Sequence, residues 1–121
     1  MFYRITTTIQ PWAVKIDNEG NNIASPARIE HLAAMGLPNT PPLLDHINPD
    51  GTYVVYRDFD TQEQAEAWDA YYTNSGRSDL VGTTVWSEVD TKQVGAYTDS
   101  YLALTDEEKI ALWNSTPSKA D

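Results

Sequence analysis

Residues 52–59 constrain the fold of this chain more than any other stretch of its sequence. They are mostly β-branched or aromatic, which favours a strand. Alternation places Val54 and Tyr56 on one side of that strand. Tyr53 and Val55 then lie on the other side. Because a strand that is apolar on both sides has to be covered on both sides, we expect a sheet with material packed on each face.

Three other segments carry strand patterns, and we expect all four strands to share one sheet. Residues 2–9, 43–47 and 83–89 are short runs rich in apolar and β-branched types. The turn Asn48-Pro49-Asp50-Gly51 separates 43–47 from 52–59. Proline suits the second position of a turn, and glycine accepts a positive φ. These two strands are therefore predicted to form a hairpin.

Two helices are predicted between the strands. Ser25, followed by a proline, begins a helix over 26–35, since a serine hydroxyl caps the first turn and proline fits the first helical position. Residues 61–74 repeat apolar side chains at helical spacing. We expect Asp60 to cap this second helix and Glu63 to reach back to the cap.

A third helix is expected near the end of the chain. Thr105 and the glutamate three residues later form a capping-box pattern that begins a helix over 105–114. Spacing turns Ile110 and Trp113 of this helix inward. Residues 90–104, which precede it, show no regular pattern and are expected to be irregular.

The order of these elements over residues 1–90 resembles the split βαβ arrangement of the ferredoxin-like superfold. It is similar in the same way to the dimeric α+β barrel proteins. The resemblance implies an α+β fold, with an antiparallel sheet and helices on one face. A hairpin excursion at 12–24 and the C-terminal helix would be additions. We expect a single α+β domain over 1–114 and a frayed C-terminal tail over 115–121.

That arrangement leaves one face of the sheet without helices, and the strands make this face partly apolar. Leaving several such side chains in water would forgo roughly 1.5–3 kcal/mol for each of them. We expect self-association through this face, and hence a homodimer. The alternatives are that the chain's own segments 12–24 or 90–114 cover this face, or that a small ligand does. The candidate binding residues, on this face or in a pocket, are Trp86, Tyr53 and Trp12.

Residues for catalysis are sparse. There is no cysteine, which excludes disulfides, thiolate metal sites and cysteine nucleophiles. His31 is expected at the solvent boundary of its helix. Asp45 precedes His46, but adjacent residues of a strand point to opposite faces, so Asp45 is not expected to orient the imidazole. We predict no catalytic residue and no cofactor.

Carboxylate patterns do not predict a metal site either. Residues 17–21 resemble part of a calcium loop, but the glycine is out of place and Arg28 stands where the bidentate glutamate belongs. Asp58 and Asp60 flank Phe59 and could in principle divide acid and base roles. We interpret them instead as a solvated strand end and a helix cap.

Charge and hydropathy exclude other classes of partner. The 121 residues include 8 basic and 18 acidic side chains, for a formal net charge of −10 at pH 7. Such a surface repels phosphate, so we expect neither nucleic-acid binding nor anchoring to anionic lipid. With no run of 18 apolar residues and no secretory pattern, a cytoplasmic location is predicted.

The acidic, cysteine-free composition is similar to that of small uncharacterised proteins encoded by tailed phages, for which the location would be the host cytoplasm or the virion. These observations favour a non-catalytic interaction or accessory protein that acts by self-association or partner binding. A small-molecule-binding protein or enzyme of the dimeric α+β barrel type is the first alternative. An acidic inhibitor of a nucleic-acid-binding protein is the second, and it would need carboxylates spaced like phosphates on one face.

Overall fold

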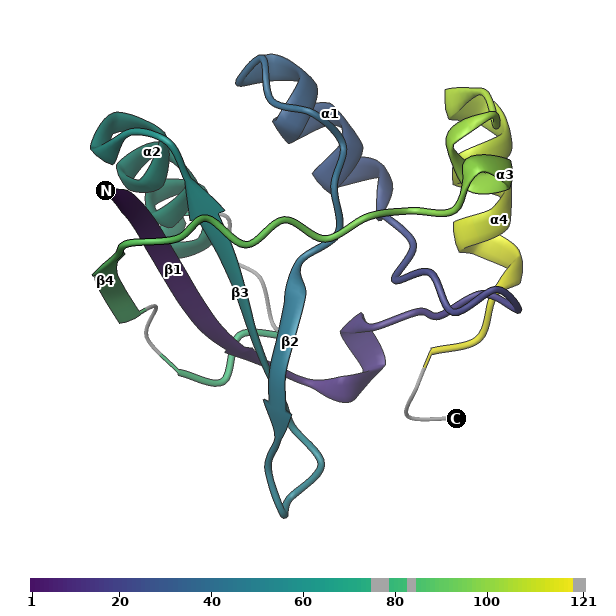
Figure 1. The fold of residues 1–121 in the computed structure, drawn as a ribbon. Helices are drawn as coiled ribbons and strands as arrows, with labels where there is room; N and C mark the ends of the chain where they lie inside the picture. The colour runs from purple at the N-terminus through teal and green to yellow at the C-terminus, as the bar shows by residue number, and fades with distance from the viewer. Residues whose placement is uncertain (75–78, 83–84, 119–121) are drawn as a thin grey trace. The chain divides into compact units, whose positions relative to one another are not determined.

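The computed structural model describes residues 1–74, 79–82 and 85–118, which group into two compact units (Figure 1). The sheet unit comprises Met1–Pro11 and Pro42–Val94, and the helical unit comprises Trp12–Pro41 and Gly95–Asp121. In chain order, the elements among the described residues are β1 (Phe2–Ile9), η1 (Pro11–Ala13), α1 (Pro26–Ala34), β2 (Leu43–Ile47), β3 (Tyr53–Phe59), α2 (Gln62–Asn74), β4 (Val85–Val89), α3 (Asp99–Leu102) and α4 (Asp106–Ser115). The prediction of a single domain over 1–114 stays a prediction.

The sheet unit contains a four-stranded sheet in the order β2-β3-β1-β4, and all three neighbouring pairs are antiparallel. This confirms the α+β class and the antiparallel sheet. Strands β1 and β2 have the predicted bounds, and β3 begins one residue later than expected, at Tyr53. Residues 83–84 of the predicted last strand lie outside the described residues, and β4 begins at Val85.

The hairpin between β2 and β3 is confirmed, together with its turn. The Gly51 N–H donates to the Asn48 carbonyl over 2.9 Å, and Gly51 has a φ of 90°, a conformation that glycine adopts without strain. The Asp50 carboxylate accepts bonds from the Thr52 hydroxyl, over 2.6 Å, and from its backbone N–H, over 3.0 Å. The hydroxyl bond is the main reason why the pKa of Asp50 lies below its ordinary value.

Helix α2 covers one face of the sheet by packing on β1 and β3. Its Trp68 is only 1% exposed, and its ring centroid lies 5.9 Å from that of Phe59. The Arg57 guanidinium carbon lies 4.9 Å from the centre of the same indole, within cation–π range. Register then places Ile5 of β1, which pairs with Arg57, on this face. The core of the sheet unit lies between these two layers.

The predicted cap of α2 is wrong by one residue. Gln64 N–H donates to the Thr61 hydroxyl over 3.2 Å, and the Gln64 side chain accepts from the Thr61 N–H over 3.3 Å. Thr61 and Gln64 therefore form the reciprocal bonds that were expected of Asp60 and Glu63. The Asp60 carboxylate instead accepts from the Lys92 ammonium over 2.9 Å.

The other face of the sheet is less apolar than expected, because alternation also brings charged side chains to it. Arg4 makes two bonds to the Asp58 carboxylate, of 2.8 and 3.0 Å, and its guanidinium lies 4.1 Å from the centre of the Tyr56 ring. The Asp58 side chain is fully buried. It also accepts from the Gln93 N–H over 2.9 Å, and Figure 1 shows the segment after β4 passing over this side of the sheet. The chain itself thus covers the charged centre of this face.

In the helical unit, the excursion and the first helix form largely as predicted. Ile16 and Asn22 form an isolated antiparallel bridge around a tight turn, although residues 11–13 are a 3₁₀ helix and not part of that hairpin. The Ser25 hydroxyl accepts from the Arg28 N–H over 3.2 Å and so caps α1. Gly36, with a φ of 70°, follows the end of this helix.

Two tyrosines build the core of the helical unit, in a segment where no helix was expected. Tyr97 and Tyr101 are 7% and 1% exposed, and their ring centroids lie 4.3 Å apart. Together with Ile23 they form a buried cluster. Residues 99–102 are the short helix α3, which corrects the expectation of irregular structure over 90–104. Side chains that pack around the cluster are Leu104, Leu112 and Trp113.

Helix α4 has the predicted capping box but not all of the predicted inward face. The Thr105 hydroxyl accepts from the Glu108 N–H, and the Glu108 carboxylate accepts from the Thr105 N–H. Lys109 is buried and its ammonium lies 5.5 Å from the centre of the Tyr101 ring, whereas Ile110 is 36% exposed. Lys109 can be buried in place of Ile110 because its alkyl stem is apolar and its ammonium lies over an aromatic ring. The helix ends at Ser115, and residues 119–121 of the predicted tail lie outside the described residues.

Candidate functional site

Strand β4 forms one edge of the sheet and exposes two large apolar side chains. Val85 is 59% exposed and Trp86 is 38% exposed. On its inner side β4 pairs with β1, where Trp86 stands opposite Ile5, and the Trp86 ring lies 5.4 Å from that of Tyr3. No described residue pairs with its outer side. This edge thus combines unpaired backbone with exposed apolar side chains, which is the combination that other strands bind.

Strand β2 forms the opposite edge and also exposes two large apolar side chains, Leu44 at 52% and Ile47 at 51%, but its pairing is irregular. Its register against β3 shifts between Leu44 and His46, so that Asp45 is an additional residue, as in a β-bulge. Both Asp45 and His46 are exposed. A bulge with a charged residue is one of the devices that keep an edge strand from pairing with another chain.

The bulge also overturns the expectation that Asp45 does not orient His46. The His46 Nδ1 lies 2.6 Å from an Asp45 carboxylate oxygen, because the bulge removes the strict alternation of side chains. The His46 Nε2 lies 3.1 Å from the Asn48 amide oxygen, and the Asn48 NH₂ donates to the Thr52 hydroxyl over 3.0 Å. Both ring nitrogens therefore face oxygen acceptors.

The three predicted binding residues do not form one cluster. Trp86 lies on the β4 edge, and Tyr53 is a half-buried residue at the start of β3, where it pairs with Ile9 and Ile47. Trp12 is 46% exposed and belongs to the helical unit. Register places Trp86, opposite Ile5, and Tyr53, opposite Ile9, on the face that α2 covers and not on the helix-free face.

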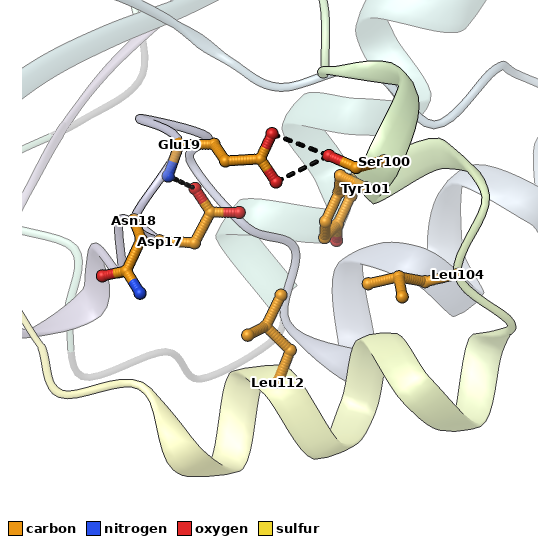
Figure 2. Close-up of a pocket in the computed structure, with 7 residues that line it drawn as sticks. All are labelled: Asp17, Asn18, Glu19, Ser100, Tyr101, Leu104 and Leu112. Atoms are coloured by element: carbon orange, nitrogen blue, oxygen red, sulfur yellow. Dashed lines mark hydrogen bonds between the residues drawn. The ribbon is translucent and has the colours of Figure 1, made fainter.

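The helical unit contains a pocket of about 270 Å³ that no single sequence pattern indicated (Figure 2). Its lining residues come from the turn at 17–19, from α3 and the residue two positions after it, and from α4. The apolar part is formed by Tyr101, Leu104 and Leu112, and the polar part by Asp17, Asn18, Glu19 and Ser100. The Ser100 hydroxyl donates to the Glu19 carboxylate, with its two oxygens 2.6 and 2.7 Å away.

The segment that resembled a calcium loop is a hydrogen-bonded turn. One Asp17 carboxylate oxygen accepts from the backbone N–H groups of Glu19 and Asn21, each over 2.9 Å. The other accepts from the Asn21 amide NH₂ over 3.0 Å, and that amide also contacts Thr98. No group of three or more His, Asp or Glu side chains suited to a metal ion occurs in the part of the chain that the structure describes.

The remaining titratable candidates are also held by other groups. Asp58 pairs with Arg4, and Asp60 pairs with Lys92, so the two carboxylates have separate partners and do not form an acid–base pair. His31 is partly buried in α1, and this burial lowers the pKa of its imidazole below the ordinary value. None of these three side chains lines the pocket of the helical unit.

Comparison with known proteins adds no family to these observations. A scan against protein-family models found no match, and searches of the curated proteins and of the solved structures found none either. Among the helices that the described residues form, none has the length and apolar character needed to cross a membrane.

Proposed function

We propose that this chain is a non-catalytic interaction protein that acts by self-association, and that a second copy of the chain pairs along the outer side of β4. The observation that carries the proposal is an edge strand with Val85 and Trp86 exposed and with no described pairing partner on its outer side. Burial of these side chains and pairing of the edge backbone would both favour association.

The contrast between the two edges of the sheet supports β4 as the contact. The β2 edge carries a bulge and the exposed charge of Asp45, both of which disfavour strand addition. The β4 edge pairs with β1 without a register shift over its five residues, Val85–Val89. A regular strand of this kind accepts a partner strand, and an identical strand in the antiparallel sense is self-complementary.

Side-chain chemistry favours one register for this pairing. With Ser87 opposite Ser87 of the second copy, Val85 faces Val89 and Trp86 faces Glu88. This register avoids placing Glu88 opposite Glu88, where like charges would destabilise the pair. A two-fold axis through Ser87 would then join two four-stranded sheets into one continuous sheet.

Sedimentation over a concentration series tests the proposal. The natural chain should move from monomer to dimer as its concentration rises, and Val85→Lys should raise the dissociation constant at least tenfold, because an edge lysine blocks strand pairing. Leu44→Lys is the matched control, since Leu44 is 52% exposed on the opposite edge strand and the charge change is the same.

Far-UV circular dichroism and thermal unfolding check that both lysine variants fold like the natural chain. Each lysine makes the acidic chain less negative, so weaker repulsion between chains cannot explain a loss of dimer. A natural chain that stays monomeric, or a Val85→Lys variant that dimerises as the natural chain does, would overturn the proposal.

For the fold we propose the split βαβ arrangement that the order of elements implies. It is supported by the strand order β2-β3-β1-β4, in which the first and third strands occupy the centre and every neighbour is antiparallel. The phage origin and the cytoplasmic location stay predictions from composition.

A further inference from the structure

The pocket of the helical unit joins an apolar wall to an acidic rim. Leu104, Leu112 and Tyr101 supply the wall, and Figure 2 shows Leu104 and Leu112 pointing toward Tyr101. Asp17 and Glu19 lie on the rim with their carboxylates. The volume of about 270 Å³ is below the roughly 300–1,000 Å³ that drug-sized ligands occupy, so it fits one small group.

The charge of the rim is not neutralised within the described residues. No ion pair of the described chain involves the carboxylate of Asp17 or of Glu19. Of the ammonium groups in the helical unit, those of Lys15 and Lys109 lie nearest in sequence to pocket residues. Among the described residues neither pairs with a rim carboxylate, although Lys109 contacts Tyr101 of the pocket wall. Lys15 donates to the Trp113 carbonyl over 2.7 Å, and the Lys109 ammonium lies over the Tyr101 ring. The helical unit as a whole has 8 acidic and 4 basic residues.

The Glu19 carboxylate is held in place by its neighbours. Ser100 donates to it from α3, and the Thr98 hydroxyl lies 3.1 Å from the Ser100 hydroxyl. At the base of the turn, Asp17 accepts the Glu19 N–H. These bonds hold both the carboxylate and the backbone N–H of Glu19. A ligand would therefore meet a charge that is already positioned.

We propose that this pocket binds an alkylammonium group, with the ammonium at Glu19 and the alkyl stem against Leu104 and Leu112. The Asp17 oxygens already accept three bonds within the turn, so Asp17 adds negative charge beside the contact. The rim excludes anions by charge, and the apolar wall offers no ligands to a hard metal cation. Both Glu19 oxygens already face Ser100, which disfavours the bidentate bonds of a guanidinium. An ammonium is a point charge and needs no such fork. A lysine side chain of a protein and a free small amine share this chemistry.

Titration with n-butylammonium chloride, followed by methyl and amide NMR, tests the site directly. Resonances of Leu104, Leu112 and Ser100 should shift in a saturable manner, with a dissociation constant on the order of millimolar for one small cation at an open pocket. The neutral isostere n-butanol should shift them far less at equal concentration. If n-butanol and n-butylammonium act alike, or if neither shifts these resonances, the proposal is wrong.

The substitution Glu19→Gln separates charge from structure. Glutamine keeps an oxygen that accepts the Ser100 hydroxyl, so the turn should fold unchanged while n-butylammonium binds about three- to five-fold more weakly. Glu30→Gln is the matched control, because Glu30 is an exposed residue of α1 in the same unit and lies outside the pocket lining. Equal weakening by both variants would mean that n-butylammonium responds to overall charge only, which would refute the site.

A second titration distinguishes the two sources of the ammonium group. A short peptide with one central lysine should bind more tightly than n-butylammonium if the pocket receives a protein side chain, and no more tightly if it receives a free amine. A peptide with norleucine at that position should bind in neither case. Binding of the norleucine peptide at the same resonances would contradict recognition of the ammonium. Because these readouts lie in the helical unit, they are independent of the β4 contact.

Discussion

Close approach of two chain segments, and not backbone conformation, requires glycine at position 95. A Cβ added there would lie 2.8 Å from the Pro41 side chain and 2.9 Å from the Pro41 carbonyl oxygen. Because the carbonyl cannot move without the backbone, we expect Gly95→Ala to lower the free energy of unfolding by about 1–3 kcal/mol. Urea denaturation measures the change. Gly82→Ala is the control, since no described atom lies within 4 Å of its added Cβ, and it should stay within about 0.5 kcal/mol of the natural chain. Equal losses in both variants would contradict steric exclusion at Gly95.

At the scale of single residues, short sequence patterns predicted secondary structure better than they predicted which side chains contact one another. The alternation rule placed Asp45 and His46 on opposite faces, and a bulge brought them together, because a register shift depends on the partner strand. Helical spacing turned Ile110 inward, but Lys109 is the buried neighbour. Lys109 is buried because its ammonium lies over the Tyr101 ring, and this contact exists only in the folded chain. Neither partner is visible in a short window of sequence.

At the scale of elements, the capping box of α4 makes a prediction about pH. The hydrogen bond from the Thr105 N–H is the main cause, and the bonded Thr105 hydroxyl the second, of a Glu108 pKa below the ordinary value. A carboxyl whose pKa is lowered by folding stabilises the fold above its unfolded pKa, and this contribution is lost as the pH falls through the folded pKa. An NMR titration of Glu108 should therefore give a midpoint below that of an unfolded peptide. Thr105→Ala should move the midpoint part of the way back up, since the backbone bond remains. An unchanged midpoint in Thr105→Ala would show that the hydroxyl plays no part.

Elements with strong local signals were predicted nearly to the residue, and those with long-range causes were not. Ser25 before proline, the turn that ends in Gly51 and the Thr105 capping box each act within four residues, so the sequence is sufficient to locate them. Helix α3 is a single turn whose Tyr101 is fixed by Ile23 and Tyr97, residues remote in sequence or outside the helix. The pocket beside α3 depends on contacts between residues that lie about 80 positions apart in the sequence, such as Glu19 and Ser100. No periodicity encodes such a pair.

At the scale of the whole molecule, a net charge of −10 acts on the two proposed contacts in opposite directions. Two chains that pair along β4 bring together two acidic surfaces, so their repulsion opposes the apolar contact of Val85 and Trp86. An ammonium that approaches Glu19 is attracted by the same field. Salt shortens the screening length from about 30 Å at 0.01 M to about 3 Å at 1 M, and so weakens both effects.

Raising sodium chloride from about 0.02 M to about 0.5 M should therefore tighten self-association several-fold and loosen n-butylammonium binding by a similar factor. Sedimentation and the NMR titration measure the two constants on the same sample of the natural chain. Val85→Lys should stay monomeric at both salt concentrations, since screening cannot restore a blocked strand edge. If salt loosened the dimer instead, ion pairs between the copies would hold it together and the apolar edge of β4 could not be the contact. If salt left ammonium binding unchanged, the stem alone would account for the affinity, and the two carboxylates on the rim would have no part in recognition.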